Sequence, residues 1–394
     1  MDAGRIDHVL QDAVTSGEVP GVVAVAGNAE GTLYEGAFGR RDISRPEAMT
    51  LDTMVWIPSM TKALVSTAAM QLVEQGKVAL DQDLGGILPA LANPQVLEGW
   101  DASGAPRLRP ARAPVTLRRL LTHTAGFSYE MWNADIVRYQ AQAGIPGIIS
   151  CEDRALLTPL VADPGTRWEY GINIDYVGKL VEALSGQLLD AYLAEHLFAP
   201  LGMTDTTFRI RPDQRPRLAA MHARSAPGGA LAPIPFEVPQ DPEFHMGGGG
   251  LYSMARDYLA FCRMILNRGS LNGTRVLRAE TVAQMTQNQM GPLDVTRLLS
   301  VQPAATNDAE FFPGMVKKWG FGFMIGTEAV PGRRAANSLT WAGLANTYFW
   351  IDPANGIAGV ILTQILPFAD PAVLRLYDAF ETEIYGGADA ARTA

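Results

Sequence analysis

The hydrophobic and polar positions at the start of the chain predict a helix, two strands and a second helix. Apolar residues recur at helical spacing over residues 5–16. Residues 20–42 form two apolar runs around a polar turn at 28–31, which predicts a β-hairpin. After Ser59 the apolar residues again follow the helical period, and Gly76 is a suitable end for that helix.

The middle of the chain, from about residue 80 to 200, reads as helical fragments joined by long loops. Residues 115–123 and 174–186 have helical apolar spacing, and Gly186 is placed to end the second of these helices. The stretch 99–114 is polar and rich in Pro and Arg. It predicts an exposed hairpin or insertion loop, not a linker between independent domains.

After residue 245 the pattern predicts a helix over 255–269, several strands joined by short turns, and a closing amphipathic helix over 372–386. The expected strands are 319–326, 337–343, 346–352 and 356–364. Strands near both chain ends, around a helical middle, predict one sheet assembled from both termini.

Composition and charge narrow the class of protein. With 394 residues, 47% hydrophobic and 19% charged, the chain is typical of a globular enzyme with more than one domain or subdomain. A net charge of −9 argues against nucleic acid or an anionic membrane surface as partner. No segment reads as a bilayer span or secretory signal, so a cytoplasmic location is expected. Cys151 and Cys262 show no metal-ligand spacing and are expected as buried free thiols.

Ser59 and Lys62 are the first candidates for chemistry, in the segment WIPSMTKAL. Positions i and i+3 share a helix face, so the hydroxyl and the amine can meet. A serine nucleophile needs a base, and a lysine serves when burial favours its neutral form. Free N–H groups at a helix start also stabilise developing negative charge. The alternative is a helix cap beside a solvated lysine, but the apolar residues on both sides favour burial.

Two further segments offer the missing catalytic parts. Tyr170 precedes a helix at a loop junction, where its side chain can serve as general base and general acid. Ala342 and Gly343 form a small-residue strand edge that a substrate can approach closely. The N–H of Leu344, together with that of Ser59, is placed to form an oxyanion hole. The alternatives are an ordinary core aromatic and an ordinary strand with one glycine.

Distinctive strings in a fixed order show a resemblance that covers nearly the whole chain. The chain resembles the serine β-lactamase/penicillin-binding-protein superfamily, and more closely the class C β-lactamase-like esterases called family VIII carboxylesterases. The segments that carry the resemblance are SMTK (59–62), EQGKVALDQDL (74–84), LRRLLTHTAGF (117–127), WEYGINIDYVG (168–178), FAPLGMTDTTF (198–208), GGGGLYSMARDYLAF (247–261), WAGLANTYFWIDP (341–353) and LTQILPFAD (362–370).

The resemblance implies a fold, a domain division and catalytic roles. The implied fold is α/β (α+β), with an antiparallel sheet flanked by helices and an inserted mainly helical domain. The α/β domain would comprise residues 1–80 and 205–394, the helical domain residues 81–204, and the active site the cleft between them. By the same resemblance Ser59 is the acylated nucleophile, and Lys62 and Tyr170 activate it and shuttle protons.

Two departures from the family pattern bear on the substrate. Trp341 stands where a β-lactamase has the Lys of Lys-Thr-Gly, so an apolar surface with one N–H replaces a positive charge. Ile172 stands where class C enzymes have the Asn of Tyr-x-Asn, which leaves Asn173 or Asn346 as candidates to hold a substrate amide. Both changes favour neutral esters over β-lactams and amides.

The sequence therefore predicts a serine carboxylesterase that hydrolyses short-to-medium acyl esters through an acyl-enzyme on Ser59. Trp341, Ala342 and Gly343 are the predicted substrate-binding strand. The alternatives on the same site are a β-lactamase, a D-amino peptidase or an acyltransferase that passes the acyl group to an alcohol. A non-catalytic penicillin sensor is a further alternative, against which the intact Ser59, Lys62 and Tyr170 argue.

The remaining motifs predict no metal and no cofactor. The five histidines show no ligand pairing, and the glycines 247–250 are not followed by the Lys-Ser/Thr of a phosphate loop, so a tight turn near the site is expected. Tyr129, Met131 and Trp132 are candidates for a pocket wall, with core packing as the alternative. The expected partner is a small-molecule ester, and the expected state is a monomer or small homo-oligomer.

Overall fold

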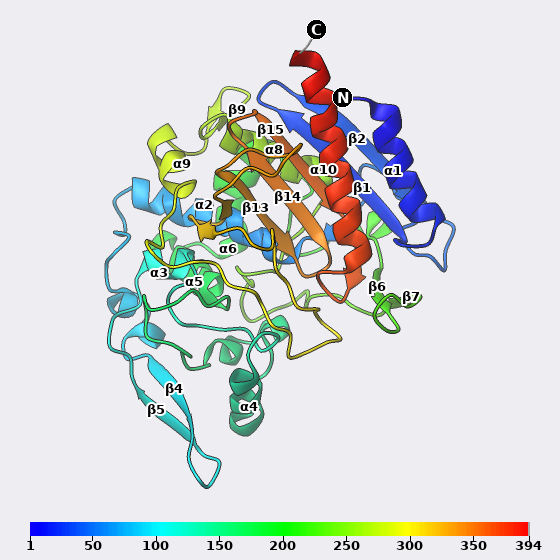
Figure 1. The fold of residues 1–394 in the computed structure, drawn as a ribbon. Helices are drawn as coiled ribbons and strands as arrows, with labels where there is room; N and C mark the ends of the chain where they lie inside the picture. Colours follow the sequence, from blue (N-terminus) through cyan, green and yellow to red (C-terminus); the bar gives the residue numbers. More distant parts are fainter. Residues whose placement is uncertain (393–394) are drawn as a thin grey trace.

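The computed structural model describes residues 1–392, and a seven-stranded antiparallel sheet lies at its centre (Figure 1). The strand order is β11-β12-β13-β14-β15-β1-β2. The first and last parts of the chain therefore meet where β1 pairs with β15. This confirms the prediction of one sheet built from both termini. Its strands are β1 (Gly21–Asn28), β2 (Thr32–Gly39), β11 (Lys317–Trp319), β12 (Met324–Gly326), β13 (Ser338–Gly343), β14 (Thr347–Asp352) and β15 (Ile357–Leu362).

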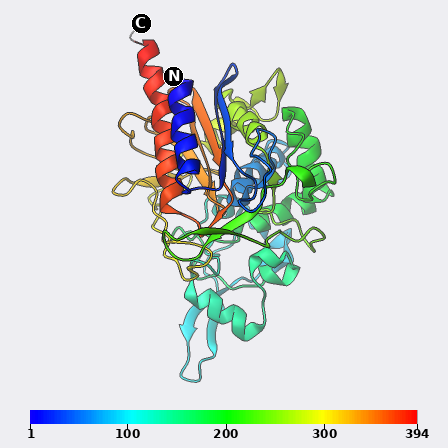
Figure 2. The ribbon, with the colours of Figure 1, turned by 90° about the vertical axis from the view of Figure 1, so that its right-hand side faces the viewer.

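Helices cover both faces of the sheet (Figure 2). On one face α1 (Ala3–Thr15) and α10 (Pro371–Arg392) lie side by side, and on the other α8 (Ala255–Leu266) packs against β1, β14 and β15. Every residue of β13, β14 and β15 is buried. A strand covered on both faces has no solvent side, which is why these strands read as continuous apolar runs.

The middle of the chain packs beside the sheet as short helices and loops (Figure 1). α2 (Thr61–Glu74), which follows Ser59, contacts α5 (Asn173–Ser185) of this region. The expected hairpin over 99–114 is present and begins slightly earlier. The other elements here are β4 (Gln95–Trp100), β5 (Pro106–Pro110), α3 (Leu117–Leu121), α4 (Ala134–Ala143), α6 (Leu189–Leu193) and α7 (Ala199–Leu201), while α9 (Ala279–Met285) follows α8 later in the chain. The domain boundaries at residues 80 and 205 stay a prediction.

One predicted strand is wrong. Residues 319–326 form not a single strand but the last residue of β11, a turn and the whole of β12. Gly322 lies in this turn with φ +95°, a backbone conformation that favours glycine. A Cβ on Gly320 would lie 2.1 Å from the carbonyl oxygen of Met285, so the turn is pressed against the segment after α9. The apolar pattern concealed this turn because its residues are buried like those of the strands.

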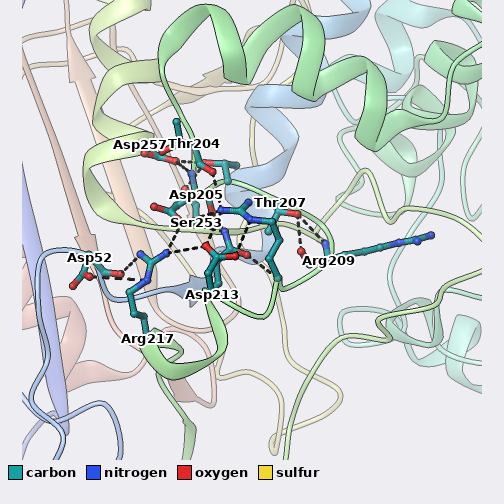
Figure 3. Close-up of polar contacts among 12 residues, drawn as sticks. Asp52, Thr204, Asp205, Thr207, Arg209, Asp213, Arg217, Ser253 and Asp257 are labelled. Carbon is teal, nitrogen blue, oxygen red and sulfur yellow. Dashed lines mark hydrogen bonds and ion pairs between the residues drawn. The ribbon is translucent and has the colours of Figure 1, made fainter.

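A small strand pair positions the segment that precedes Ser59. β3 pairs with β8, and polar contacts hold the loop over residues 204–217, in which Thr207 pairs with Tyr252 of β8 (Figure 3). Asp205 accepts a hydrogen bond of 2.6 Å from Arg217, and Asp257 on α8 accepts one of 2.8 Å from the Asp205 N–H. The remaining short strands are β3 (Val55–Trp56), β6 (Met221–Arg224), β7 (Leu231–Ile234), β8 (Tyr252–Ser253), β9 (Ser270–Leu271), β10 (Thr274–Arg275) and β16 (Ile365–Leu366).

The structure also describes the state of the two cysteines and the length and character of the helices. Cys151 and Cys262 are both free and buried, as expected. Within residues 1–392, none of the helices combines the length and the apolar character that crossing a membrane requires.

Candidate active site

Ser59 lies in a 3-10 turn (Pro58–Met60) between β3 and α2. The N-cap position of α2 is Met60, and no side chain caps either the turn or the helix. Lys62 is only 1% exposed. The alternative of a capping serine beside a solvated lysine is therefore wrong, because Ser59 does not cap the helix and the lysine is inside the protein.

The Lys62 amine is held by three oxygen atoms. Its Nζ lies 2.9 Å from Ser59 Oγ, 3.0 Å from the Tyr129 hydroxyl and 2.6 Å from the Gly248 carbonyl oxygen. Burial lowers the pKa of Lys62 below that of an exposed lysine, while the negative charge of Asp175 opposes this effect. A neutral amine within hydrogen-bond distance of a serine hydroxyl can accept its proton.

Tyr170 completes the group around Ser59. Its hydroxyl makes hydrogen bonds with Ser59 and with the Trp341 indole, whose Nε1 donates over 2.9 Å. Burial raises the pKa of Tyr170 above its ordinary value, and these two hydrogen bonds only partly oppose the increase. Lys62 Nζ lies 4.8 Å from the centre of the Tyr170 ring. Tyr170 is therefore protonated at neutral pH and placed to give a proton rather than take one.

A cavity of about 500 Å³ opens at Ser59. The predicted residues Ser59, Tyr170, Trp341 and Leu344 line it, with Lys62 buried behind Ser59. Among the residues that the structure describes, no charged side chain is part of the lining. Its other walls are Trp56, Pro58, Tyr129, Met131, Trp132, Ile148, Ile149, Met246, Gly248, Gly249, Leu298, Ala342, Gly343 and Phe368.

Glycine at position 343 allows β13 to approach the turn that carries Ser59. A Cβ added there would lie 2.3 Å from Thr347 Oγ1 and 2.9 Å from the Ile57 carbonyl oxygen. Contacts this short force a shift of the strand. The close approach brings Leu344 and Ser59 to the same cavity, which is the arrangement that an oxyanion hole of their two N–H groups requires.

The glycine run and the aromatic segment both belong to the site. Residues 247–249 form a turn, as expected, and its Gly248 carbonyl accepts from Lys62. Tyr129, Met131 and Trp132 line the cavity. Of the two interpretations that the sequence left open, a pocket wall or core packing, the structure supports the pocket wall. The contact of Tyr129 with Lys62 was missed, because nothing in the local pattern links two residues so far apart in the chain.

Asn173 and Asn346, the candidates to hold a substrate amide, lie outside the cavity, so their proposed contact with substrate is wrong. The Asn173 amide lies 3.0 Å from His123 Nδ1, and the ring of that histidine packs against Tyr170. The Asn346 amide donates to the carbonyl oxygens of Ile365 and Pro367, at 2.9 Å and 2.8 Å. Neither residue lines the cavity. The Asn173 amide instead contacts a buried imidazole, and the Asn346 amide holds the backbone.

Comparison with known proteins decides the family. The sequence model of the family described as Beta-lactamase matches residues 6–383, nearly the whole chain. The chain belongs to the beta-lactamase family. As a member of this family it shares its fold with simvastatin synthase of Aspergillus terreus, whose unliganded structure aligns with a TM-score of 0.83 and 32% identity over 98% of each chain.

Curated relatives of this beta-lactamase-family protein carry out acyl transfer. It is 34% identical to monacolin J acid methylbutanoyltransferase of Aspergillus terreus, over 96% of this chain and 95% of the relative. It is 30% identical to lovastatin esterase of Penicillium rubens, over 96% of this chain and 98% of the relative. The protein is thus an enzyme of a serine acyl-transfer family that includes acyltransferases and an ester hydrolase.

Proposed function

We propose that the protein takes an uncharged acyl group from an ester onto Ser59 and passes it to a hydroxyl acceptor, preferably a neutral alcohol. The observation that carries the proposal is the Ser59–Lys62–Tyr170 group opening into an uncharged, largely apolar cavity. Relatives named as methylbutanoyltransferases support transfer of a short acyl group to an acceptor. Hydrolysis, the outcome predicted from the sequence, is the second candidate, and the relative named lovastatin esterase supports it.

Acylation follows from the protonation states around Ser59. Lys62 accepts the Ser59 proton as Oγ forms a bond to the carbonyl carbon of the ester, and the carbonyl electron pair moves to its oxygen. The N–H groups of Ser59 and Leu344 stabilise that oxyanion. When the tetrahedral intermediate collapses, the bond to the leaving oxygen breaks. Tyr170 gives that oxygen a proton and regains one from the Lys62 ammonium.

Deacylation is the reverse sequence with a new hydroxyl compound. An alcohol or a water molecule takes the place of the departed alcohol and attacks the acyl carbon, while its proton passes through Tyr170 to Lys62. The bond from the acyl carbon to Ser59 Oγ then breaks, and Oγ regains a proton from the Lys62 ammonium, which releases the new ester or acid and leaves free Ser59. The outcome depends on which acceptor occupies the cavity. Aromatic walls such as Trp132 and Phe368 favour an apolar alcohol over water, because burying apolar surface is favourable.

The absence of charge in the described cavity lining also bears on β-lactams. A β-lactam carries a carboxylate, and burying a carboxylate without a cation is costly. Trp341 occupies the place of the lysine of the family motif, and its only N–H already donates to Tyr170. We therefore expect weak or absent turnover of β-lactams and of amide substrates that end in a carboxylate.

A panel of nitrophenyl esters of increasing acyl length, run beside a chromogenic cephalosporin, tests the proposal. We expect turnover of short-to-medium esters, little turnover of the cephalosporin, and loss of activity in Ser59→Ala. Added butanol should divert product from free acid to butyl ester. Near-full activity in Ser59→Ala would refute the assignment of the nucleophile. A product ratio that does not respond to the alcohol would favour the esterase over the acyltransferase.

A further inference from the structure

Asp175 is a buried carboxylate beside the site to which the mechanism above gives no role. It lies in the first turn of α5 and is fully buried. Its Oδ1 accepts a hydrogen bond of 2.8 Å from the Gly248 N–H. Its Oδ2 faces the Tyr129 hydroxyl, which hydrogen-bonds with the Asp175 side chain. A buried carboxylate is costly to the fold unless a nearby positive charge compensates it, so the position of Asp175 relative to Lys62 needs an explanation.

The Gly248 peptide links this carboxylate to the catalytic lysine. Its N–H donates to Asp175, and its carbonyl oxygen accepts from Lys62 over 2.6 Å. A Cβ added to Gly248 would lie 2.6 Å from both Asp175 Oδ2 and the Tyr129 hydroxyl, so these atoms meet in one small space. The same hydroxyl lies 3.0 Å from Lys62 Nζ. Asp175 is thus linked to Lys62 in two ways, through the Gly248 peptide and through the Tyr129 hydroxyl.

We propose that Asp175 is the positioning residue for Lys62: its carboxylate fixes the Gly248 carbonyl against the amine and supplies the negative charge that keeps the buried lysine a proton acceptor near neutral pH. The proposal rests on the function proposed above, in which Lys62 takes the Ser59 proton. Without Asp175, burial alone would act on the lysine and lower its basicity further. A weaker base removes the serine proton less effectively.

Other ionisable groups face the pair, and most of them stay neutral. Burial raises the pKa values of the surrounding phenols and thiol, and it lowers the pKa of the histidine. The remaining group is Glu130, whose carboxylate accepts a hydrogen bond of 2.9 Å from the Ile148 N–H. Burial raises its pKa too. These groups are Tyr129, Glu130, Cys151, Tyr170 and Tyr176 around Asp175, and His123 beside Lys62.

The sign of the pH effect follows from the charges. The Ser59 reaction accelerates with rising pH as Lys62 loses its proton, so the acid limb of the pH–rate profile follows the Lys62–Asp175 pair. Asp175→Asn keeps an oxygen for the Gly248 N–H but removes the negative charge. The pKa of Lys62 then falls, and the acid limb moves to lower pH by about one unit or more. The plateau rate falls at the same time, because the base is weaker.

The rate of Ser59 labelling by a fluorophosphonate, measured against pH, is the decisive readout. It needs the base but no ester substrate, so it tests Asp175 even if the protein turns over none of the esters above. The matched control is Asp257→Asn, which neutralises another buried carboxylate whose pKa burial raises to about 6, on α8 and outside the cavity lining. Its acid limb should coincide with that of the unaltered protein.

The proposal is overturned if the acid limb of folded Asp175→Asn stays in place, because a purely structural loss lowers the rate at every pH alike. If Asp175→Asn does not fold, Asp175→Glu replaces it. Glutamate keeps the charge and displaces the carboxylate by one methylene, so the limb should stay near its original pH while the rate falls. A limb that moves to lower pH in Asp175→Glu would equally contradict the proposal.

Discussion

Trp341 contributes to both the cavity wall and the contacts of Tyr170. Its ring lines the cavity, and its Nε1 donates to the Tyr170 hydroxyl over 2.9 Å. The sequence predicted an apolar surface with one free donor for the substrate. The donor is instead used within the protein, so a substrate meets only the indole ring. At the scale of one residue, Trp341 therefore places an uncharged ring in the cavity wall and a hydrogen-bond donor on Tyr170.

Trp341→Phe separates these two effects. Phenylalanine keeps an apolar ring in the wall but removes the hydrogen bond to Tyr170. Loss of one hydrogen bond of about 1 kcal/mol predicts a roughly fivefold decrease in kcat, with a smaller change in KM. Steady-state kinetics on a nitrophenyl ester measure both. The control is Trp132→Phe, since Trp132 also lines the cavity but its Nε1 has no partner among the described residues. An unchanged kcat in Trp341→Phe would show that the hydrogen bond does not orient Tyr170.

At the scale of elements, the site depends on how closely β13 packs against the turn that carries Ser59. The two elements come from opposite parts of the chain and are in direct contact. Gly343 makes the contact possible, because any side chain there would overlap Thr347 and Ile57. The next residue, Leu344, lines the same cavity as Ser59. The spacing of these two elements therefore sets the geometry of the proposed oxyanion hole.

Gly343→Ala should separate the two elements by a small amount. Overpacking of this kind costs about 1–3 kcal/mol of stability. Displacing one oxyanion donor lowers kcat by about 10²-fold. The control is Gly326→Ala on the neighbouring strand β12, where the nearest atom to an added Cβ is 3.7 Å away. Thermal unfolding and ester kinetics test both variants. If Gly343→Ala turned over esters as fast as Gly326→Ala, the proposed role of Leu344 would be wrong.

At the scale of the whole molecule, the closing helix α10 is tied to the sheet by a buried ion pair. Arg334, in the loop between β12 and β13, is 1% exposed, and Glu381 on α10 is fully buried. The guanidinium reaches both carboxylate oxygens, at 2.7 Å and 2.6 Å, and also the Tyr377 hydroxyl. Removing one partner of such a pair leaves an uncompensated buried charge.

Glu381→Gln is therefore expected to lower the free energy of unfolding by about 3–5 kcal/mol. Activity per folded molecule should hardly change, because neither partner lines the cavity. The control is Asp378→Asn on the same helix, which removes an exposed partner of Arg333 and should cost at most about 1 kcal/mol. Urea unfolding measures both variants. Equal stability of the two variants would mean that burial of the Arg334–Glu381 pair adds nothing to the free energy of unfolding.

The sequence by itself determined the features that depend on local spacing. Ser59 and Lys62 are three positions apart, and the helical period places them together wherever that segment lies. The apolar runs of β13, β14 and β15 likewise identified buried strands. A strand covered on both faces is apolar throughout, so its sequence shows no alternation of apolar and polar residues. The order of the family motifs then predicted the fold that the comparisons confirm.

Only the tertiary structure decided which distant groups reach the lysine and which do not. Tyr129, Asp175 and Gly248 converge around Lys62 from separate segments, whereas Asn173 turns toward His123. An aspartate inside an apolar helix was a signal for Asp175, but its target was not readable from local pattern. The physical reason is that helix and strand periods specify which face a side chain occupies, while packing between elements specifies what that face meets.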